Sequence, residues 1–167
     1  MTTTFTRAAI GALTTVIDGV ATTGLRNLAS NAVRLGPAIT PGSTPALEAS
    51  YRLKAKYAST LATTGITVAQ CWFVRDVGND SNYENVGVVD GSTSVYPLRA
   101  PDFIFIWDGA SAHGSSAAEY MASIPAVVSR PSCNHKILLR NTSGVATANA
   151  NDTDTILSES TQNELGT

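Results

Sequence analysis

The densest group of oxygen-bearing side chains lies in a polar turn that directly follows an apolar stretch of the chain. Four residues within seven positions carry carboxylate or amide oxygens: Asp76, Asn79, Asp80 and Asn82. Calcium takes about six to eight oxygen ligands, so the turn could bind that ion, although it lacks the residue order of an EF-hand loop. Asx side chains also build turns by hydrogen bonding to the backbone. We therefore interpret the segment as the structural turn of a β-hairpin, with calcium as the alternative.

A second candidate for chemistry is the segment Gly109-Ala-Ser-Ala-His-Gly114, which follows an apolar run. A nucleophile elbow has the pattern G-x-S-x-G between a strand and a helix, and Ser111 would be its nucleophile. His113 stands where the second glycine belongs, and Pro125 would break a helix placed after it. We therefore predict a glycine- and serine-rich loop here, and keep an esterase-like hydrolase only as a remote reading.

Cysteine and histidine are too few and too scattered for a tetrahedral zinc site. The chain has two cysteines, Cys71 and Cys133, and two histidines, His113 and His135. Each cysteine falls in a predicted strand, which favours a buried free thiol, with a disulfide between paired strands as the alternative. His135 also falls in a predicted strand and is expected to be half-exposed. The chain has no glycine-rich phosphate loop and no dinucleotide fingerprint, so we expect no cofactor, no metal and no catalytic activity.

Charge and composition narrow the choice of partners. Apolar residues make up 43% of the chain, which is typical of a globular domain, and charged residues only 14%, with a net charge of −2. Arg52, Lys54 and Lys56 alternate with apolar residues and are expected on the solvated face of a strand, so nucleic acid is not an expected partner. No apolar run reaches the roughly 18 residues of a membrane span, and the first residues lack the pattern of a signal peptide.

The elements that would position these residues are predicted to be strands. Apolar and polar residues alternate strictly over residues 47–57, which indicates a half-buried strand with Leu47, Tyr51, Leu53 and Tyr57 facing inward. Further strands are predicted at residues 66–76, 92–99, 102–107, 117–128, 135–141 and 145–158. Thr142-Ser143-Gly144 is predicted to be the hairpin loop between the last two. Together they predict an all-β fold, an antiparallel β-sandwich of about 7–8 strands over residues 46–158.

Residues 1–45 show no steady period, and three prolines near their end favour an extended path. We predict an extended N-terminal arm, with a short helix over residues 24–33 as an option, and expect deletion of residues 1–40 to leave a folded sandwich. Its apolar residues are expected to anchor the arm on a partner: Phe5, Ile10, Leu13, Ile17, Leu25, Leu28, Leu35 and Ile39. Residues 159–167 are predicted to form a polar, peripheral C-terminal tail.

Three short motifs follow one another along the predicted strands. Asn82-Tyr83 ends the polar turn, Leu98-Arg99 lies in a later strand, and Asn141-Thr-Ser-Gly144 lies in the last predicted hairpin. With these motifs in this order, residues 46–158 resemble the small β-sandwich structural proteins of tailed-bacteriophage virions. The chain departs from their pattern at Asn79-Asp80-Ser81, where an Asp-Gly usually precedes Asn-Tyr, and in an inserted-looking loop over residues 109–119.

The resemblance implies a non-enzymatic virion component of the capsid decoration or cement type, assembled in the host cytoplasm. Such a protein would bind the major capsid protein or other virion proteins, and copies of itself as a dimer or trimer. The long N-terminal segment is similar to arms that these proteins lay across neighbouring subunits. The alternative is a carbohydrate- or receptor-binding sandwich of a head spike or tail fibre, whose aromatic platform would come from Trp72, Trp107, Tyr83 and Tyr96. The two tryptophans lie in apolar strands, which favours core positions for them.

Overall fold

The computed structural model describes residues 5–7, 12–20, 23–41, 48–61, 66–78, 80–84, 90–91, 99–107, 119–123, 128–149, 151, 155–162 and 164–166. Every regular element in these ranges is a strand, and none is an α-helix. The strands are β1 (Phe5–Arg7), β2 (Thr14–Ile17), β3 (Val33–Leu35), β4 (Glu48–Lys56), β5 (Ile66–Asp76), β6 (Phe103–Trp107), β7 (Glu119–Ser123), β8 (Val128–Ser129), β9 (Asn134–Asn141), β10 (Ile156–Gln162) and β11 (Glu164–Gly166).

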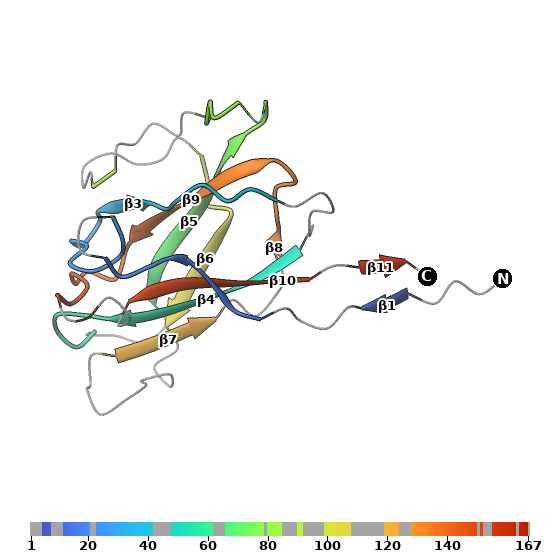
Figure 1. Cartoon of the computed structure of the whole chain (residues 1–167). Coiled ribbons are helices and arrows are strands. Elements are labelled where there is room, and N and C mark those ends of the chain that lie inside the picture. The colour runs from blue at the N-terminus through green and yellow to red at the C-terminus, as the bar shows by residue number, and fades with distance from the viewer. Residues whose placement is uncertain are drawn as a thin grey trace.

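Two antiparallel sheets form a β-sandwich, which confirms the predicted fold class (Figure 1). One sheet has the order β2-β10-β4-β7, and β8 pairs with the end of β4 that β7 leaves free. The other has the order β3-β9-β5-β6. A third, two-stranded sheet joins β1 to β11 and extends away from the sandwich. The described sandwich therefore has nine strands rather than seven or eight, because β2 and β3 of the expected arm belong to it.

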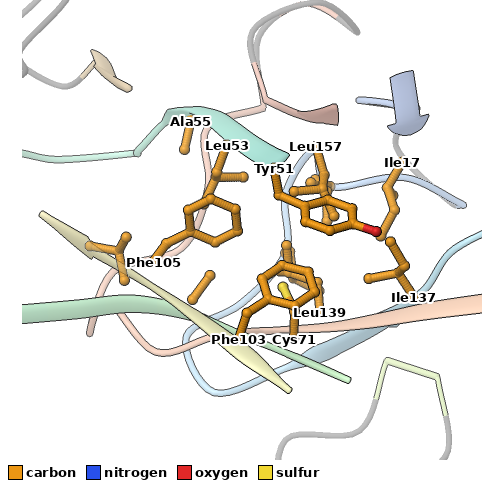
Figure 2. Close-up of a cluster of buried hydrophobic side chains, with 14 of the residues drawn as sticks. Ile17, Tyr51, Leu53, Ala55, Cys71, Phe103, Phe105, Ile137, Leu139 and Leu157 are labelled. Carbon is orange, nitrogen blue, oxygen red and sulfur yellow. The ribbon is translucent and has the colours of Figure 1, made fainter. Parts of the chain in front are cut away.

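The main core lies between the two sheets and is built on the alternation of β4. Ala49, Tyr51, Leu53 and Ala55 point inward and are at most 3% exposed, while the residues between them are half-buried. Figure 2 shows Tyr51, Leu53 and Ala55 of β4 among side chains of β5, β6, β9 and β10. The ring of Tyr51 stacks on that of Phe103 with the centroids 4.4 Å apart. The predicted strand over residues 47–57 is thus confirmed over Glu48–Lys56, whereas Leu47 lies outside the described residues.

A smaller apolar cluster covers the outer face of the β3-β9-β5-β6 sheet. Val33, Trp72, Val74 and Leu138 are at most 3% exposed there, and Tyr83 from the segment after β5 packs against them. The indole Nε1 of Trp72 donates to the carbonyl of Arg99 at 2.9 Å. This second layer explains why β5 reads as a nearly continuous apolar run, since both of its faces are buried.

The expectation of an N-terminal arm is wrong for most of the described residues of that segment. β2 pairs with β10, and β3 pairs with β9. Ile17, Leu25 and Leu28 are at most 2% exposed within the protein's own core, so they are not anchors for a partner. The optional helix over residues 24–33 is absent, because the chain turns there through Asn27 and Asn31, which have left-handed φ angles of 57° and 65°.

The other residues that were expected to anchor an arm on a partner differ in their exposure. Leu13 is 46% exposed. Leu35 and Ile39 are half-buried, and Ile39 forms an isolated antiparallel bridge with His135. Phe5 lies in β1, where only the backbone is described, and Ile10 lies outside the described residues.

Three further predictions need correction. Thr142-Ser143-Gly144 is not a hairpin loop, because β9 and the next strand, β10, belong to different sheets. The strand predicted at 145–158 begins only at Ile156. The expected peripheral tail from residue 159 is instead the second half of β10, which pairs with β2 and β4, followed by β11. Of the other expected strands, the one at 117–128 is present as β7 and β8, and residues 92–98 lie outside the described residues.

Candidate functional site

The polar turn after β5 uses its acidic side chains to hold its own backbone. Asp76 is fully buried, and its two carboxylate oxygens accept from the backbone N–H groups of Asp80 at 3.2 Å and Ser81 at 2.7 Å. Asp80 in turn accepts from the N–H of Asn82 at 3.0 Å. The N–H of Glu84 donates to the carbonyl of Arg75 at 2.8 Å, so the chain folds back on β5. These contacts support the structural interpretation of the turn.

The pKa of Asp76 reflects the same contacts. Burial is the largest single influence and raises the pKa, but the hydrogen bonds from Ser81, Asp80 and Asn134 together bring it below its ordinary value. The carboxylate is therefore charged in the folded protein at neutral pH. Asn79, the fourth residue of the calcium hypothesis, lies outside the described residues.

The residues considered for hydrolysis and metal binding are placed as follows. Ser111 and His113 lie outside the described residues. His135 is fully buried rather than half-exposed, and its ring meets that of Phe73 edge-on at 5.6 Å. Cys71 and Cys133 are both free, which excludes the alternative disulfide. Cys71 is buried as predicted, and burial raises the pKa of its thiol well above the ordinary value.

An Arg99-centred network ties the segment after the turn to β5. The guanidinium of Arg99 donates to Asp102 at 2.8 Å and to Glu84 at 3.2 Å. It also donates to the carbonyl of Phe73, whose N–H donates to Asp102 at 2.7 Å. The arginine of the Leu98-Arg99 motif is thus a structural contact that closes the outer layer over Trp72.

A buried polar cluster, which sequence patterns did not indicate, lies at one end of the sandwich. We call Tyr51, Arg130, His135 and Glu159 the clamp cluster. The hydroxyl of Tyr51 donates to one carboxylate oxygen of Glu159 at 3.0 Å, and Arg130 donates to the other at 3.1 Å. The side chains of this ion pair are only 7% and 8% exposed. Glu159 was missed because it was assigned to a peripheral tail, although the register of β10 places it opposite Tyr51 of β4.

The clamp cluster shifts the pKa of two of its members. Burial, followed by the charge of Glu159, raises the pKa of the Tyr51 hydroxyl far above its ordinary value, so the phenol is neutral. Burial also lowers the pKa of His135, and the positive charge of Arg130 acts in the same direction. The imidazole is therefore neutral near pH 7.

The aromatic residues considered for glycan binding do not form an open platform. Trp72 is 2% exposed and Trp107 is 8% exposed. Tyr83 is half-buried and carries the ammonium of Lys136 over its ring at 4.3 Å, and Tyr96 lies outside the described residues. Core positions are thereby confirmed for both tryptophans, Trp107 between the sheets and Trp72 under the outer layer.

Two features remain as candidate assembly surfaces. The first is the terminal ribbon, β1 with β11, in which Phe5 is opposite Gly166 and Arg7 is opposite Glu164. No other described strand pairs with either of its edges. The second is the outward face of β6, where Ile104 is 37% and Ile106 is 53% exposed at the edge of a sheet.

Comparison with protein-family models, curated proteins and solved structures finds no match to this chain. Among the described residues, no helix is long and apolar enough to cross a membrane.

Proposed function

We propose that this protein is a non-enzymatic structural component of a bacteriophage virion. In this proposal it is a capsid decoration or cement protein that binds the lattice of the major capsid protein and copies of itself. The sequence motifs described above motivate the virion assignment, and the arrangement of the chain supports an assembly role. Its localisation would be the virion, after assembly in the host cytoplasm.

The observation that carries the assembly role is the terminal ribbon. β1 precedes β2 and β11 follows β10, so the ribbon continues outward from two strands that are paired within the sandwich. Each of its strands has three residues. A short two-stranded ribbon is marginally stable in water by itself, and its unpaired edges can accept a strand from another chain. A partner that covers the ribbon would thus stabilise it and gain main-chain hydrogen bonds.

The low charge of the chain and the face of β6 support the same role. Only 14% of the residues are charged, so fewer charges need to be desolvated when surfaces meet. Ile104 and Ile106 offer a small apolar patch that is too limited to form an interface alone, since stable interfaces bury about 800 Å² per partner. Attachment would therefore combine several weak contacts over many copies.

The test compares two truncations on particles that lack the protein. Deleting residues 1–7 removes β1, whereas deleting residues 1–4 keeps all residues of that strand and serves as the control. We expect both truncated chains to fold, and the longer deletion to bind particles at least about tenfold more weakly than the control. Equal binding would show that the ribbon is not the contact.

The location in the virion is tested separately by the copy number in purified particles, measured on a stained gel. Hundreds of copies per particle are expected for a decoration protein, and about a dozen or fewer would indicate a fibre or tail component. Absence of the protein from purified particles, or no binding by the intact chain, would contradict the proposal as a whole.

A further inference from the structure

We propose that the clamp cluster is an acid-sensitive device that holds the strands carrying the terminal ribbon at neutral pH and loosens them when His135 takes up a proton. The inference concerns the isolated chain and goes beyond its proposed role in a virion.

Glu159 lies where the ribbon leaves the sandwich. In β10 it is opposite Thr14 of β2 and opposite Tyr51 of β4. β10 ends at Gln162 and β11 begins at Glu164, so the buried carboxylate is a few residues from the ribbon. Any change that weakens the contacts of Glu159 with Arg130 and Tyr51 therefore acts on β10, which lies between β2 and β4.

Arg130 and Glu159 depend on one another because both are buried. Removing a charged group from water is costly, so each member of the pair is stabilised by its partner, and Glu159 also accepts from the Tyr51 hydroxyl. Arg130 directly follows β8, and Glu159 belongs to β10. The pair consequently connects the short strand at the edge of the sheet to the strand that carries the ribbon.

His135 lies in the opposite sheet, and its ring packs against that of Phe73, which also contacts the ring of Tyr51. The Nδ1 of His135 lies 2.9 Å from the carbonyl oxygen of Cys133, so Nδ1 carries the proton and donates. Its Nε2 is buried and has no hydrogen-bond partner in the part of the chain that the structure describes. Protonation would place an N–H on this nitrogen with no acceptor among the described residues, in a ring that packs against the apolar ring of Phe73.

The charges around His135 oppose its protonation. Arg130, after β8, and Arg75, its register partner in β5, are both positive, and among the described residues Glu159 in β10 is the negative charge that acts on it. That carboxylate already accepts from Arg130 and from the neutral Tyr51. An added positive charge on His135 would therefore compete with Arg130 for Glu159, and repel the guanidinium.

The direction of the pH effect follows from the lowered pKa of His135. The ordinary value of 6.5 applies to the unfolded chain, which takes up the proton first as the pH falls. The contribution of neutral His135 to stability is thus complete above about pH 6.5 and is lost progressively as the pH falls toward the pKa of the folded state. Local opening around β10 should increase over the same interval.

The experiment is backbone hydrogen exchange of the full chain by NMR at about pH 7.5 and about pH 5, corrected for intrinsic exchange. The variants are His135→Gln, which cannot be protonated, and His113→Gln, which removes the other histidine as a control. We expect the protection of amides in β10 to fall by about tenfold or more at the lower pH in the native chain and the control. In His135→Gln the change should stay within about twofold. An equal loss in His135→Gln, or no loss in the native chain, would overturn the proposal.

A direct titration covers the case in which His135→Gln does not fold. The imidazole resonances of the native chain belong to two histidines, and His113→Gln identifies which one is His135. The proposal requires a midpoint for His135 below 6.5, accompanied by shifts of the amide resonances of β10. A midpoint at or above that value, or a titration that leaves the β10 resonances unchanged, would refute it.

Discussion

Single side chains from the last third of the sequence attach the N-terminal segment to the sandwich. Asn141 is 2% exposed, and its Nδ2 donates to the carbonyls of Leu28, Ala29 and Val145. The hydroxyl of Thr147 accepts from the N–H of Leu28 at 2.7 Å and donates to the carbonyl of Leu25. Backbone groups of an irregular buried segment need such partners, so these two side chains replace the hydrogen bonds of a helix or strand.

The first prediction concerns Asn141. Asn141→Ala removes the Nδ2 hydrogen bonds to three carbonyls and takes the Oδ1 acceptor away from the buried N–H of Ser143, and should lower the free energy of unfolding by about 3 kcal/mol. Asn82→Ala is the control, since Asn82 is exposed and should change stability by no more than about 0.5 kcal/mol. Urea denaturation curves of the two variants provide the measurement. Similar midpoints would contradict the role given to Asn141.

The second prediction concerns Asp76. Because its pKa is lowered in the folded state, its contribution to stability is present above the unfolded value of 3.8 and is lost as the pH falls through the folded pKa. Asp76→Asn should therefore show a smaller decrease in melting temperature below about pH 4 than the native chain. Thermal unfolding between about pH 5 and pH 2.5 tests this, and parallel curves would contradict it.

The same turn allows a test of the calcium alternative. The Asp76 oxygens accept two backbone N–H groups, so we expect chelator to leave the melting temperature of the purified protein unchanged. A fall of many degrees on addition of chelator, reversed by calcium, would restore the metal interpretation.

At the scale of an element, β4 is the most regular part of the molecule. Leu53 is 3% exposed and borders a cavity of about 10 Å³ that is also lined by Leu25, Leu28 and Leu139. The cavity is large enough for about one water molecule, which is too small for a larger ligand. Its presence means that removing more side-chain volume there would enlarge an existing void.

The third prediction follows from this packing. Leu53→Ala should lower the free energy of unfolding by about 2–5 kcal/mol. Arg52→Ala changes the adjacent, half-buried residue on the opposite face of β4 and should cost no more than about 0.5 kcal/mol. Chemical denaturation of both variants measures the difference. Comparable midpoints would show that the assigned faces of β4 are wrong.

At the scale of the whole molecule, the N-terminal segment is part of the fold rather than an accessory. Residues 1–40 include β2 and β3, which each form one edge of a sheet, and the core residues Leu25 and Leu28. The segment also places Ile39 against His135, with N–H to carbonyl distances of 2.7 and 3.1 Å. Both sheets would lose an edge strand if it were removed.

The fourth prediction reverses the expectation that the sequence suggested for a long truncation. Deleting residues 1–40 should give a chain without a cooperative thermal transition, because the core beside Leu53, Leu139 and Leu157 would open to water. Deleting residues 1–7 should leave the transition within a few degrees of the native value. Calorimetry distinguishes the two deletions. A cooperative transition in the longer deletion would support the interpretation of residues 1–40 as an accessory arm.

The sequence by itself determined the strands whose buried residues recur with the two-residue period of a β-strand. β4 was predicted because one of its faces is buried and the other solvated, which imposes a period of two. β5 was predicted from its β-branched and aromatic residues. That both of its faces are buried became clear only from the structure, which shows the apolar cluster on the outer face of its sheet. The structural interpretation of the turn at Asp76 also followed from residue types, since Asx turns are formed by neighbouring residues.

Only the tertiary structure decided where residues 12–41 and 156–162 belong. Their partners are distant in the sequence: Asn141 bonds across 113 residues to Leu28, and Tyr51 across 108 residues to Glu159. Neither segment shows a clear period of two: residues 24–31 are irregular, and Ser158, Glu159 and Ser160 are buried in succession. The arm, the tail and the clamp cluster could therefore not be told apart from solvated polar segments until the sheets had brought their partners together.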